Sequence, residues 1–210
     1  YLENDANCAA IAESVAGAAK GCDSAIAITI GTGIGGGIII NKKLYAGFNG
    51  AGGELGHMVI SLNGEPCTCG RKGCWEAYSS ATALIGQTKK AALEHPKSKI
   101  NLICEGDLDK IDAKTAFDAA RMGDETGIKV IDNYLTVLAE ALANMVNIFQ
   151  PEVVVIGGGV SKEGENLLMP LREKMKGLNY CQEGLPETRL VVAKMGNDAG
   201  IVGAALISKV

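Results

Sequence analysis

Short apolar runs alternate with amphipathic stretches along the whole chain. The runs AIAITI at 25–30 and VVVI within 152–161 are rich in β-branched residues, which is typical of buried strands. RLVVAKM at 189–195 has the same character, and IIINKKLYAG at 38–47 predicts two strands joined by a turn at Asn-Lys-Lys. Strands and helices that alternate in this way predict an α/β fold.

Helical periodicity accounts for most of the remaining sequence. The longest pattern, at 127–150, predicts a helix that packs on the core or, alternatively, forms part of a dimer seam. Its apolar positions are Ile128, Ile131, Leu135, Leu138, Leu142, Met145 and Phe149. Further helices are predicted at 5–20, about 76–94, 113–122, 162–177 and 198–210, with a loop at 95–111.

Composition narrows the class of protein without identifying it. The chain has 210 residues, of which 47% are hydrophobic and 4% aromatic, and its 28 glycines suit one large α/β domain with tight turns. The net charge of −4 does not favour nucleic acid or an anionic membrane, and no apolar run reaches the roughly 18 residues that a membrane span needs. The seven cysteines are an odd number, so we expect reduced thiols and a cytoplasmic location.

Potential metal ligands are concentrated in HMVISLNGEPCTCGRKGCWEAYSS, at 57–80. Cys67, Cys69 and Cys74 follow the spacing C-x-C-x4-C, and His57 supplies a fourth ligand. Three thiolates and one imidazole form the closed tetrahedral set of a structural zinc site, whereas catalytic zinc keeps one position open for water. The alternative is a group of free thiols. We expect the other cysteines to be ordinary core or surface residues, namely Cys8, Cys22, Cys104 and Cys181.

Two glycine-rich segments follow predicted strands. GTGIGGG at 31–37 fits the pattern G-x-G-x-x-G, but the β-branched residues behind it predict a strand rather than the helix of a dinucleotide fingerprint. We interpret it as a hairpin loop whose N–H groups and Thr32 hydroxyl bind phosphate, the alternative being an ordinary tight hairpin. The second segment, at 157–159, lies between a strand and a helix, where nucleotides commonly bind, although close backbone packing would also need glycine. Neither segment has the G-K-[ST] ending of a P-loop.

Three carboxylates are further candidates for a functional site. Asp5 stands where a helix is predicted to start, so it is a helix cap or, alternatively, a general base for a hydroxyl nucleophile. Glu54 and Glu76 flank the predicted metal ligands, and both would be plain surface acids if the metal loop did not bring them together. The second nitrogen of a metal-bound histidine such as His57 remains free to donate a hydrogen bond, which suits recognition of a sugar.

Five segments together resemble one known family. ENDANCAA, TIGTGIGGGII, GAGGELGH, CTCGRKGCWE and VVVIGGGVS occur in the order and spacing of the ROK family, which comprises bacterial sugar kinases and related sugar-sensing repressors. The resemblance covers essentially the whole chain, and its Cys motif and GELGH segment are the most specific parts. It implies an actin-like, ribonuclease-H-like ATPase domain with a mixed sheet flanked by helices and a zinc-stapled loop. It also implies glucokinase-like, ATP-dependent phosphorylation of a hexose with Mg²⁺.

The resemblance also implies roles for individual residues. It places the catalytic base at Asp5, which takes a proton from the sugar hydroxyl as that hydroxyl attacks the γ-phosphate. The implied sugar contacts are Asn4, Asp5, Glu54, His57 and Glu76. The implied ligands of structural zinc are His57, Cys67, Cys69 and Cys74. The implied ATP-binding residues are Gly31, Thr32, Gly33, Gly35, Gly36, Gly37, Gly157, Gly158 and Gly159. A homodimer is implied as well.

One motif of the family, Asp-x-Gly-Gly-Thr from an N-terminal lobe, is not found in this sequence. We therefore expect the chain to be the C-terminal lobe of a longer kinase, without the N-terminal lobe and inactive by itself. In that interpretation 1–20 is an interlobe helix segment and 21–210 is the actin-like α/β domain. The alternatives are a sugar-sensing repressor, which would bind nucleic acid through an upstream helix-turn-helix, and a zinc-stapled interaction domain. Glucose is the first expectation for the hexose.

Overall fold

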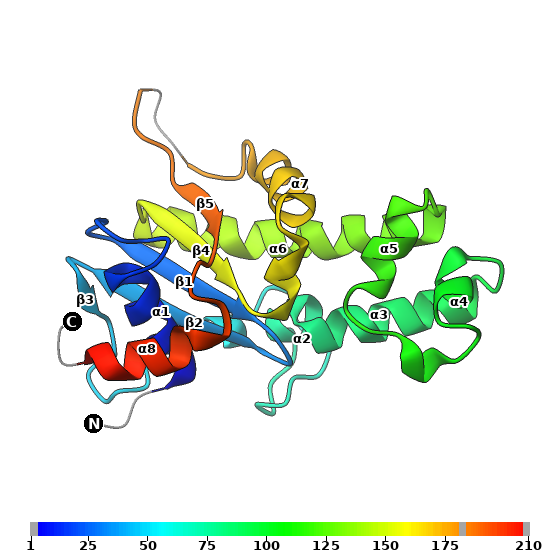
Figure 1. Ribbon diagram of the computed structural model, residues 1–210, viewed down its shortest axis with the longest axis horizontal. Helices are drawn as coiled ribbons and strands as arrows, with labels where there is room; N and C mark the ends of the chain where they lie inside the picture. Colours follow the sequence, from blue (N-terminus) through cyan, green and yellow to red (C-terminus); the bar gives the residue numbers. More distant parts are fainter. Residues whose placement is uncertain (1–3, 181–183, 208–210) are drawn as a thin grey trace.

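Five strands form one mixed sheet in the computed structural model, which describes residues 4–180 and 184–207 (Figure 1). Their order is β3-β2-β1-β4-β5, in which β1 pairs antiparallel with β2 and parallel with β4. The outer pairs are antiparallel for β2 with β3 and parallel for β4 with β5. The strands are β1 Ala25–Ile30, β2 Ile34–Ile40, β3 Lys43–Leu44, β4 Val153–Gly157 and β5 Arg189–Val192. This arrangement confirms the predicted α/β fold with a mixed sheet.

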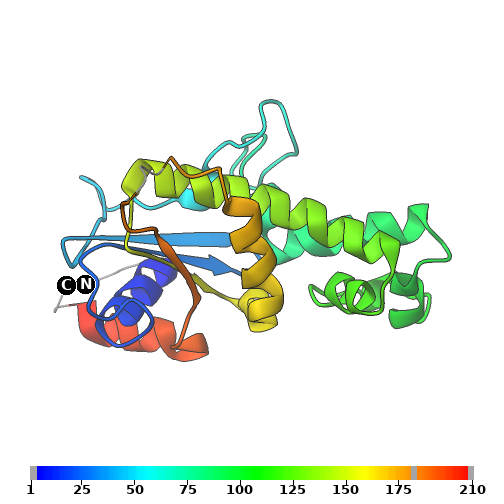
Figure 2. The same cartoon turned by 90° about the horizontal axis from the view of Figure 1, so that it is seen from above.

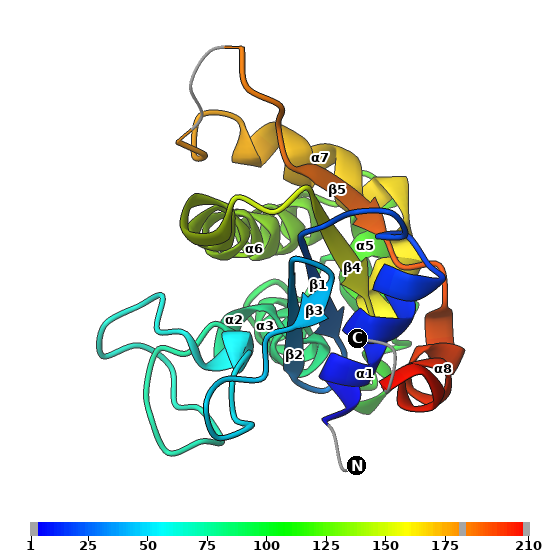
Figure 3. The same ribbon diagram turned by 90° about the vertical axis from the view of Figure 1, so that its left-hand side faces the viewer.

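Helices cover both faces of the sheet. Figure 2 shows α1 and α8 on one face and α6 on the other, and Figure 3 shows α7 beside α6. The helices are α1 Asp5–Val15, α2 Glu76–Ser79, α3 Ala81–Glu94, α4 Lys99–Ile103, α5 Thr115–Arg121, α6 Glu125–Phe149, α7 Glu165–Met175 and α8 Ala199–Leu206. Four 3-10 helices among the described residues are η1 Leu55–His57, η2 Leu108–Lys110, η3 Gly159–Glu163 and η4 Gly196–Asp198.

The two faces of the sheet carry cores of different size. On β1, Ile26, Ile28 and Ile30 face the large core beneath α6, whereas Ala25 and Ala27 face the smaller core beside α1. Small residues on the α1 side let that helix approach the sheet closely, because a strand exposes alternate residues to opposite faces. The parallel ends of β1 and β4 are thereby fixed between two packed layers.

The longest predicted helix packs mainly on the core. In α6 the side chains of Ile131, Leu135, Leu138, Leu142 and Met145 are buried, which confirms the core interpretation for those positions. The remaining predicted positions, Ile128 and Phe149, are half-exposed. The helix begins at the Asp124 cap, whose side chain accepts a hydrogen bond from Gly127. A seam between two copies stays a prediction.

Several predicted helix boundaries differ from the structure. The helix expected at about 76–94 is broken at Ser80, whose side chain caps α3 and accepts from the Ala83 N–H. The expected loop at 95–111 contains α4, which begins after the Ser98 cap. The helix expected at 5–20 ends at Val15 because the backbone turns there, and Gly21 comes later with φ +89°. Local propensity therefore predicts the presence of a helix more reliably than it predicts the residue at which the helix ends.

The predicted hairpin turn is confirmed, but the glycine-rich loop before it is shorter than expected. Asn41 and Lys42 adopt φ 52° and 63°, as a two-residue turn between β2 and β3 requires. The segment 31–37 was expected to be one loop, but β2 already begins at Ile34. The β1–β2 loop is therefore Gly31–Gly33. No helix in the described ranges is both long and apolar enough to span a membrane.

Candidate active site

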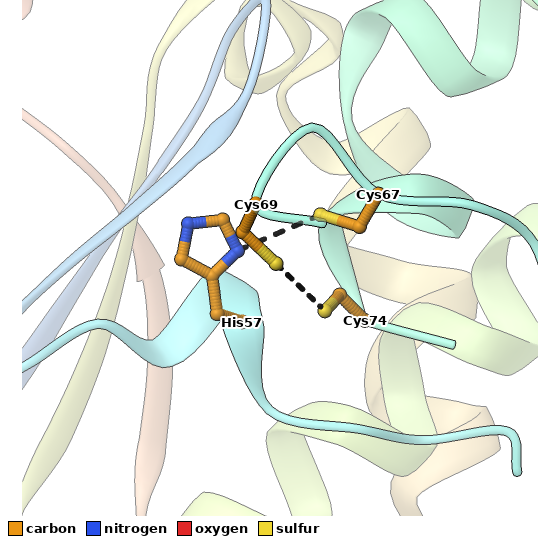
Figure 4. A group of neighbouring side chains, drawn as sticks. All are labelled: His57, Cys67, Cys69 and Cys74. Carbon is orange, nitrogen blue, oxygen red and sulfur yellow. Dashed lines mark hydrogen bonds between the residues drawn. The ribbon is translucent and has the colours of Figure 1, made fainter. Parts of the chain in front are cut away.

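Four potential metal ligands converge between η1 and α2, and we call them the Cys/His cluster (Figure 4). His57 ends η1 and Cys74 lies just before α2, with Cys67 and Cys69 on the loop between them. The Nδ1 atom of His57 is 3.6 Å from the Sγ atom of Cys67, and the Sγ atoms of Cys69 and Cys74 are 3.6 Å apart. One ligand atom from each residue lies within 4.8 Å of the others. The spacing of these four residues in the sequence thus correctly predicted that their side chains converge.

The donor set of the Cys/His cluster fits a tetrahedral metal ion. Zinc bonds to sulfur and nitrogen would place neighbouring ligand atoms about 3.5–3.8 Å apart. The two separations of 3.6 Å agree with that geometry. The four donors would fill every position of a tetrahedral ion and leave none for water. The His57 ring turns Nδ1 towards the sulfurs and Nε2 away from them (Figure 4).

Glycines allow the loop between the cysteines to turn back on itself. Gly70 and Gly73 adopt φ +86° and +80°, a conformation that residues with a Cβ rarely take. A Cβ on Gly73 would also lie 1.7 Å from the carbonyl oxygen of Ser61. The Cys67 N–H donates to the Arg71 carbonyl at 2.9 Å and closes the turn. These backbone contacts bring the three sulfurs to one side of the loop.

The sulfurs of Cys69 and Cys74 have different environments. Burial raises the pKa of the Cys74 thiol to about 12. A backbone hydrogen bond from Arg71 lowers the pKa of the exposed Cys69 thiol. Because metals bind thiolates, metal binding at the cluster would release the Cys74 proton.

Glu76 connects the Cys/His cluster to the first residue of β2. Its Oε2 atom accepts a hydrogen bond from the Ile34 N–H at 2.9 Å. Its Oε1 atom accepts one from the Thr68 hydroxyl at 3.3 Å. A Cβ on Gly33 would lie 2.3 Å from Oε2, so a side chain at this loop position would displace the Glu76 carboxylate. Glu76 is therefore placed between the loop that carries Cys67 and Cys69 and the sheet, rather than free on the surface.

The residues that follow Asp5 and Glu54 in the chain both pack on the start of β2. A Cβ on Gly36 would lie 2.7 Å from the Leu55 side chain, which follows Glu54. A Cβ on Gly35 would lie 2.7 Å from the Cβ of Ala6, which follows Asp5. Glycines in β2 thus allow the chain near Asp5 and the chain near Glu54 to approach one strand from different directions.

The sequence allowed Asp5 to be a helix cap, but in the structure it is the first residue of α1. The Asn4 side chain occupies the capping position and accepts from the Ala6 N–H at 2.7 Å. Asp5 also accepts from the Ala6 N–H, at 2.8 Å, and it remains exposed. Its carboxylate is therefore accessible to a ligand at the N-terminus of α1.

A cavity of about 430 Å³ lies where β1, β4 and β5 end, and we call it the strand-end cavity. Asp5 and Thr29 line it together with Gly157 and Gly158 from the second glycine segment. Gly158 has φ +82°, and a Cβ there would lie 2.4 Å from the Ile30 carbonyl oxygen. The carboxyl ends of parallel strands are a common place for ligands in α/β proteins. The structure thus brings the predicted base and the second glycine segment to one cavity.

The glycines of the predicted phosphate loop divide into two groups. Gly35, Gly36 and Gly37 lie in β2, where a Cβ on Gly37 would approach the Cβ of Ala10 to 2.5 Å. Close packing accounts for these three glycines, and their predicted contact with ATP stays a prediction. The β1–β2 loop contains the rest of the predicted set, and Thr32 in it is exposed.

Two residues of the strand-end cavity have no clear signal in the sequence. Glu13 is buried, and its carboxylate accepts from the N–H groups of Ala18 at 2.6 Å and Met195 at 2.8 Å. It resembled an ordinary polar residue of an Ala-rich helix. Lys162 lies on η3 and lines the cavity. The only indication in the sequence that Lys162 could face an anionic ligand was its position three residues after Gly159.

The strand order and the helices on both faces of the sheet are those of an actin-like ATPase fold. The chain belongs to the ROK family, whose model matches residues 1–210.

Known proteins similar to this chain include kinases and repressors. A glucokinase of Thermotoga maritima is 44% identical over 210 residues, which are 100% of this chain and 65% of that protein. A xylose repressor of Bacillus subtilis is 34% identical over 209 residues, covering 99% of this chain and 50% of the repressor. The chain thus spans less than two thirds of the length of these relatives.

A solved structure agrees closely in fold. The crystal structure of a ROK family glucokinase from Streptomyces griseus, in complex with glucose and AMPPNP, has a TM-score of 0.90 and 38% sequence identity. The match covers 98% of this chain and 67% of that one.

Proposed function

We propose that this chain is part of an ATP-dependent hexose kinase. The observation that carries the proposal is the position of Asp5, which lines the strand-end cavity together with Gly157 and Gly158. A carboxylate at the edge of a nucleotide cavity is suitably placed to act on a sugar hydroxyl. The similar glucokinases from Thermotoga maritima and Streptomyces griseus support the same activity.

In this proposal the hexose binds between α1 and the Cys/His cluster. Asn4, Glu54, His57 and Glu76 contact its hydroxyls, and Asp5 accepts the proton of the hydroxyl that is phosphorylated. The Nε2 side of His57, which faces away from the sulfurs, is free to donate to a sugar oxygen. Hydrogen bonds from several polar groups hold the reacting hydroxyl in place and make the reaction depend on positioning.

ATP occupies the strand-end cavity in the same proposal. Gly157, Gly158 and Gly159 lie on its adenosine side, and the Lys162 ammonium pairs with phosphate. The N–H groups of the β1–β2 loop and the Thr32 hydroxyl contact the transferred phosphate. Mg²⁺ bound with ATP screens the negative charge of the phosphates.

The Cys/His cluster holds structural zinc in this proposal. His57, Cys67, Cys69 and Cys74 would bind it, and the ion would fix the fold of the loop without an open position for chemistry. The position of Glu76, two residues after Cys74, makes the metal loop a support for the sugar contacts. A homodimer, a cytoplasmic location and the division of the chain at residue 20 remain predictions, as does inactivity of the 210-residue chain by itself.

An ATP-coupled assay of the full-length protein with a panel of sugars tests the function. The panel contains glucose, fructose, N-acetylmannosamine, N-acetylglucosamine and allose. We expect glucose to have the highest kcat/KM, since the similar kinases named above are glucokinases. Phosphorylation of none of these sugars would contradict the proposal.

A sugar-responsive repressor is the second candidate, because the xylose repressor of Bacillus subtilis is 34% identical over 99% of this chain. Binding of the full-length protein to DNA, released by a sugar and without any turnover of ATP, would favour it over the kinase.

A further inference from the structure

The β1–β2 loop is held from one side by the start of α3. The Ala81 N–H donates to the Gly31 carbonyl oxygen at 2.8 Å. The Thr82 hydroxyl donates to the Thr32 carbonyl oxygen, also at 2.8 Å. Two successive carbonyl groups of the loop are thus directed towards the same helix. Both bonds link segments about fifty residues apart, so no local turn requires them.

The direction of these carbonyls determines where the loop presents its N–H groups. In a trans peptide the N–H points opposite to the C=O of the same unit. The Gly31 carbonyl shares its peptide unit with the Thr32 N–H, and the Thr32 carbonyl shares its unit with the Gly33 N–H. Both N–H groups therefore point away from α3. Within the described ranges, neither of them donates a hydrogen bond to the protein.

The support that holds these carbonyls is itself fixed to the core. Leu84, in the first turn of α3, is fully buried. The Tyr134 hydroxyl of α6 donates to the Ser79 carbonyl oxygen at 2.8 Å, immediately before the Ser80 cap. The start of α3 is thus held by the core and by α6. Thr82, by contrast, is exposed, so its hydroxyl has no packing role to explain its position.

We propose that Thr82 is a positioning residue for ATP. By holding the Thr32 carbonyl against α3, its hydroxyl keeps the Gly33 N–H directed to the side where the phosphate binds. This inference rests on the proposed kinase function, and it adds a residue outside the predicted contacts. Thr82 itself touches neither ligand. Its loss loosens the β1–β2 loop and weakens nucleotide binding more than hexose binding, because among the described residues this loop touches the proposed hexose site only through Glu76.

Three variants of the full-length protein test the inference. Thr82→Val removes the hydroxyl and keeps the shape of the side chain, whereas Thr82→Ser restores the hydroxyl. Thr136→Val is the control, because the Thr136 hydroxyl also donates to a backbone carbonyl, that of Asp132 in α6, away from the loop. The dissociation constants of AMPPNP and of glucose are measured by calorimetry, together with KM for each substrate. A thermal unfolding curve shows whether each variant folds.

We expect Thr82→Val to raise the AMPPNP dissociation constant and the ATP KM by about 3–10-fold, the value of one hydrogen bond. Thr82→Ser should return both to within about 2-fold of wild type, and Thr136→Val should change neither. Unchanged nucleotide affinity in Thr82→Val would overturn the inference, as would equal weakening of glucose and nucleotide. A wild-type protein that phosphorylates no hexose would instead refute the proposed function, and AMPPNP binding would still report on Thr82.

Discussion

The strand-end cavity and the Cys/His cluster keep their shapes by different means. The cavity is formed by the ends of strands whose residues, such as Ile28 and Ile156, are fully buried in the core. The chain between Met58 and Cys74 has only two isolated bridges among its described residues, and Leu62 in it is 88% exposed. Core packing therefore maintains the first region without a ligand. In the proposal, the second region depends on four side chains that would share one metal ion.

Because of this difference, binding of the two proposed ligands should respond differently to changes in the protein. Nucleotide would bind to a preformed part of the sheet, and the sugar contacts would depend on a loop that has little core of its own. Changes to the metal ligands should therefore act on one region, and changes in the packing of α1 on the sheet should act on the whole fold.

Loss of the metal should give the largest effect and the clearest separation. Cys74→Ser removes a fully buried ligand, and we expect the loop at 58–74 to lose its structure because its ligands no longer converge. Amide hydrogen exchange should accelerate in this loop by about 10-fold or more and remain slow in β1 and β4. Cys104→Ser is the control, since Cys104 is equally buried but lies outside the cluster. Faster exchange in β1 and β4, or none in the loop, would remove the distinction between the regions.

Asp5→Asn should separate chemistry from structure. The change keeps the size of the side chain but removes the proposed base, so kcat should fall by about 10²–10⁴-fold. The unfolding temperature and the zinc content, measured by elemental analysis, should not change. Asp23→Asn is the control, because Asp23 forms an exposed ion pair with Lys42. A kcat within about 2-fold of wild type in Asp5→Asn would rule out the role of Asp5.

Gly37→Ala should destabilise the sheet itself. A Cβ there would lie 2.5 Å from the Cβ of Ala10 and 2.9 Å from the Ala6 carbonyl oxygen, so α1 must move away from β2. We expect a loss of about 1–3 kcal/mol in the free energy of unfolding, measured with urea. Gly86→Ala should instead stabilise the protein by about 0.5–1 kcal/mol, because Gly86 is exposed in α3 and an added Cβ would meet no atom beyond its own helix backbone within 4 Å. If both variants lost stability equally, close packing would not explain the glycines of β2.

Asp124 allows a smaller test, away from both regions. Burial would raise the pKa of this carboxyl, but hydrogen bonds from the Lys99 N–H, the Ser98 hydroxyl and the Gly127 N–H together lower the pKa. At pH 7 we expect Asp124→Ala to lose about 0.5–2 kcal/mol of unfolding free energy, as for other helix caps.

The contribution of Asp124 should depend on pH in one direction. Its pKa is depressed in the folded state, so the contribution is complete above the unfolded value of about 3.9 and disappears as the pH falls through the lower folded value. Urea unfolding of wild type and Asp124→Ala should therefore converge at low pH. Asp109→Ala, whose side chain is 94% exposed, should differ little from wild type at any pH. A difference that grew on acidification would contradict the sign of the pKa shift.

The convergence of the four candidate metal ligands was easier to predict from the sequence than the glycine loop, for a physical reason. Three cysteines and a histidine at close spacing must converge to bind an ion, so residue type and spacing define the site almost completely. A glycine indicates only that a side chain is not tolerated at its position, and it does not indicate the cause. At Gly73 the cause is a turn and a neighbouring carbonyl, whereas at Gly35 and Gly37 it is α1 lying on β2.

Some features depend on contacts that the pattern of apolar residues does not reveal. Ser80 interrupts a continuous helical pattern because its side chain caps α3. The buried Glu13 carboxylate accepts from the nearby Ala18 N–H and from the Met195 N–H, which is distant in the sequence. Thr82 likewise acts on a loop that precedes it by about fifty residues. The strands and the core face of α6 were predictable because their apolar patterns are local.

Ligand binding before and after removal of the metal tests the central claim most directly. Glucose and AMPPNP are titrated by calorimetry into the full-length protein as isolated and after chelation, with the metal content measured in both samples. The account predicts that glucose binding is lost on chelation, while the dissociation constant of AMPPNP changes by less than about 3-fold. Glucose affinity that persists in metal-free protein would contradict the account.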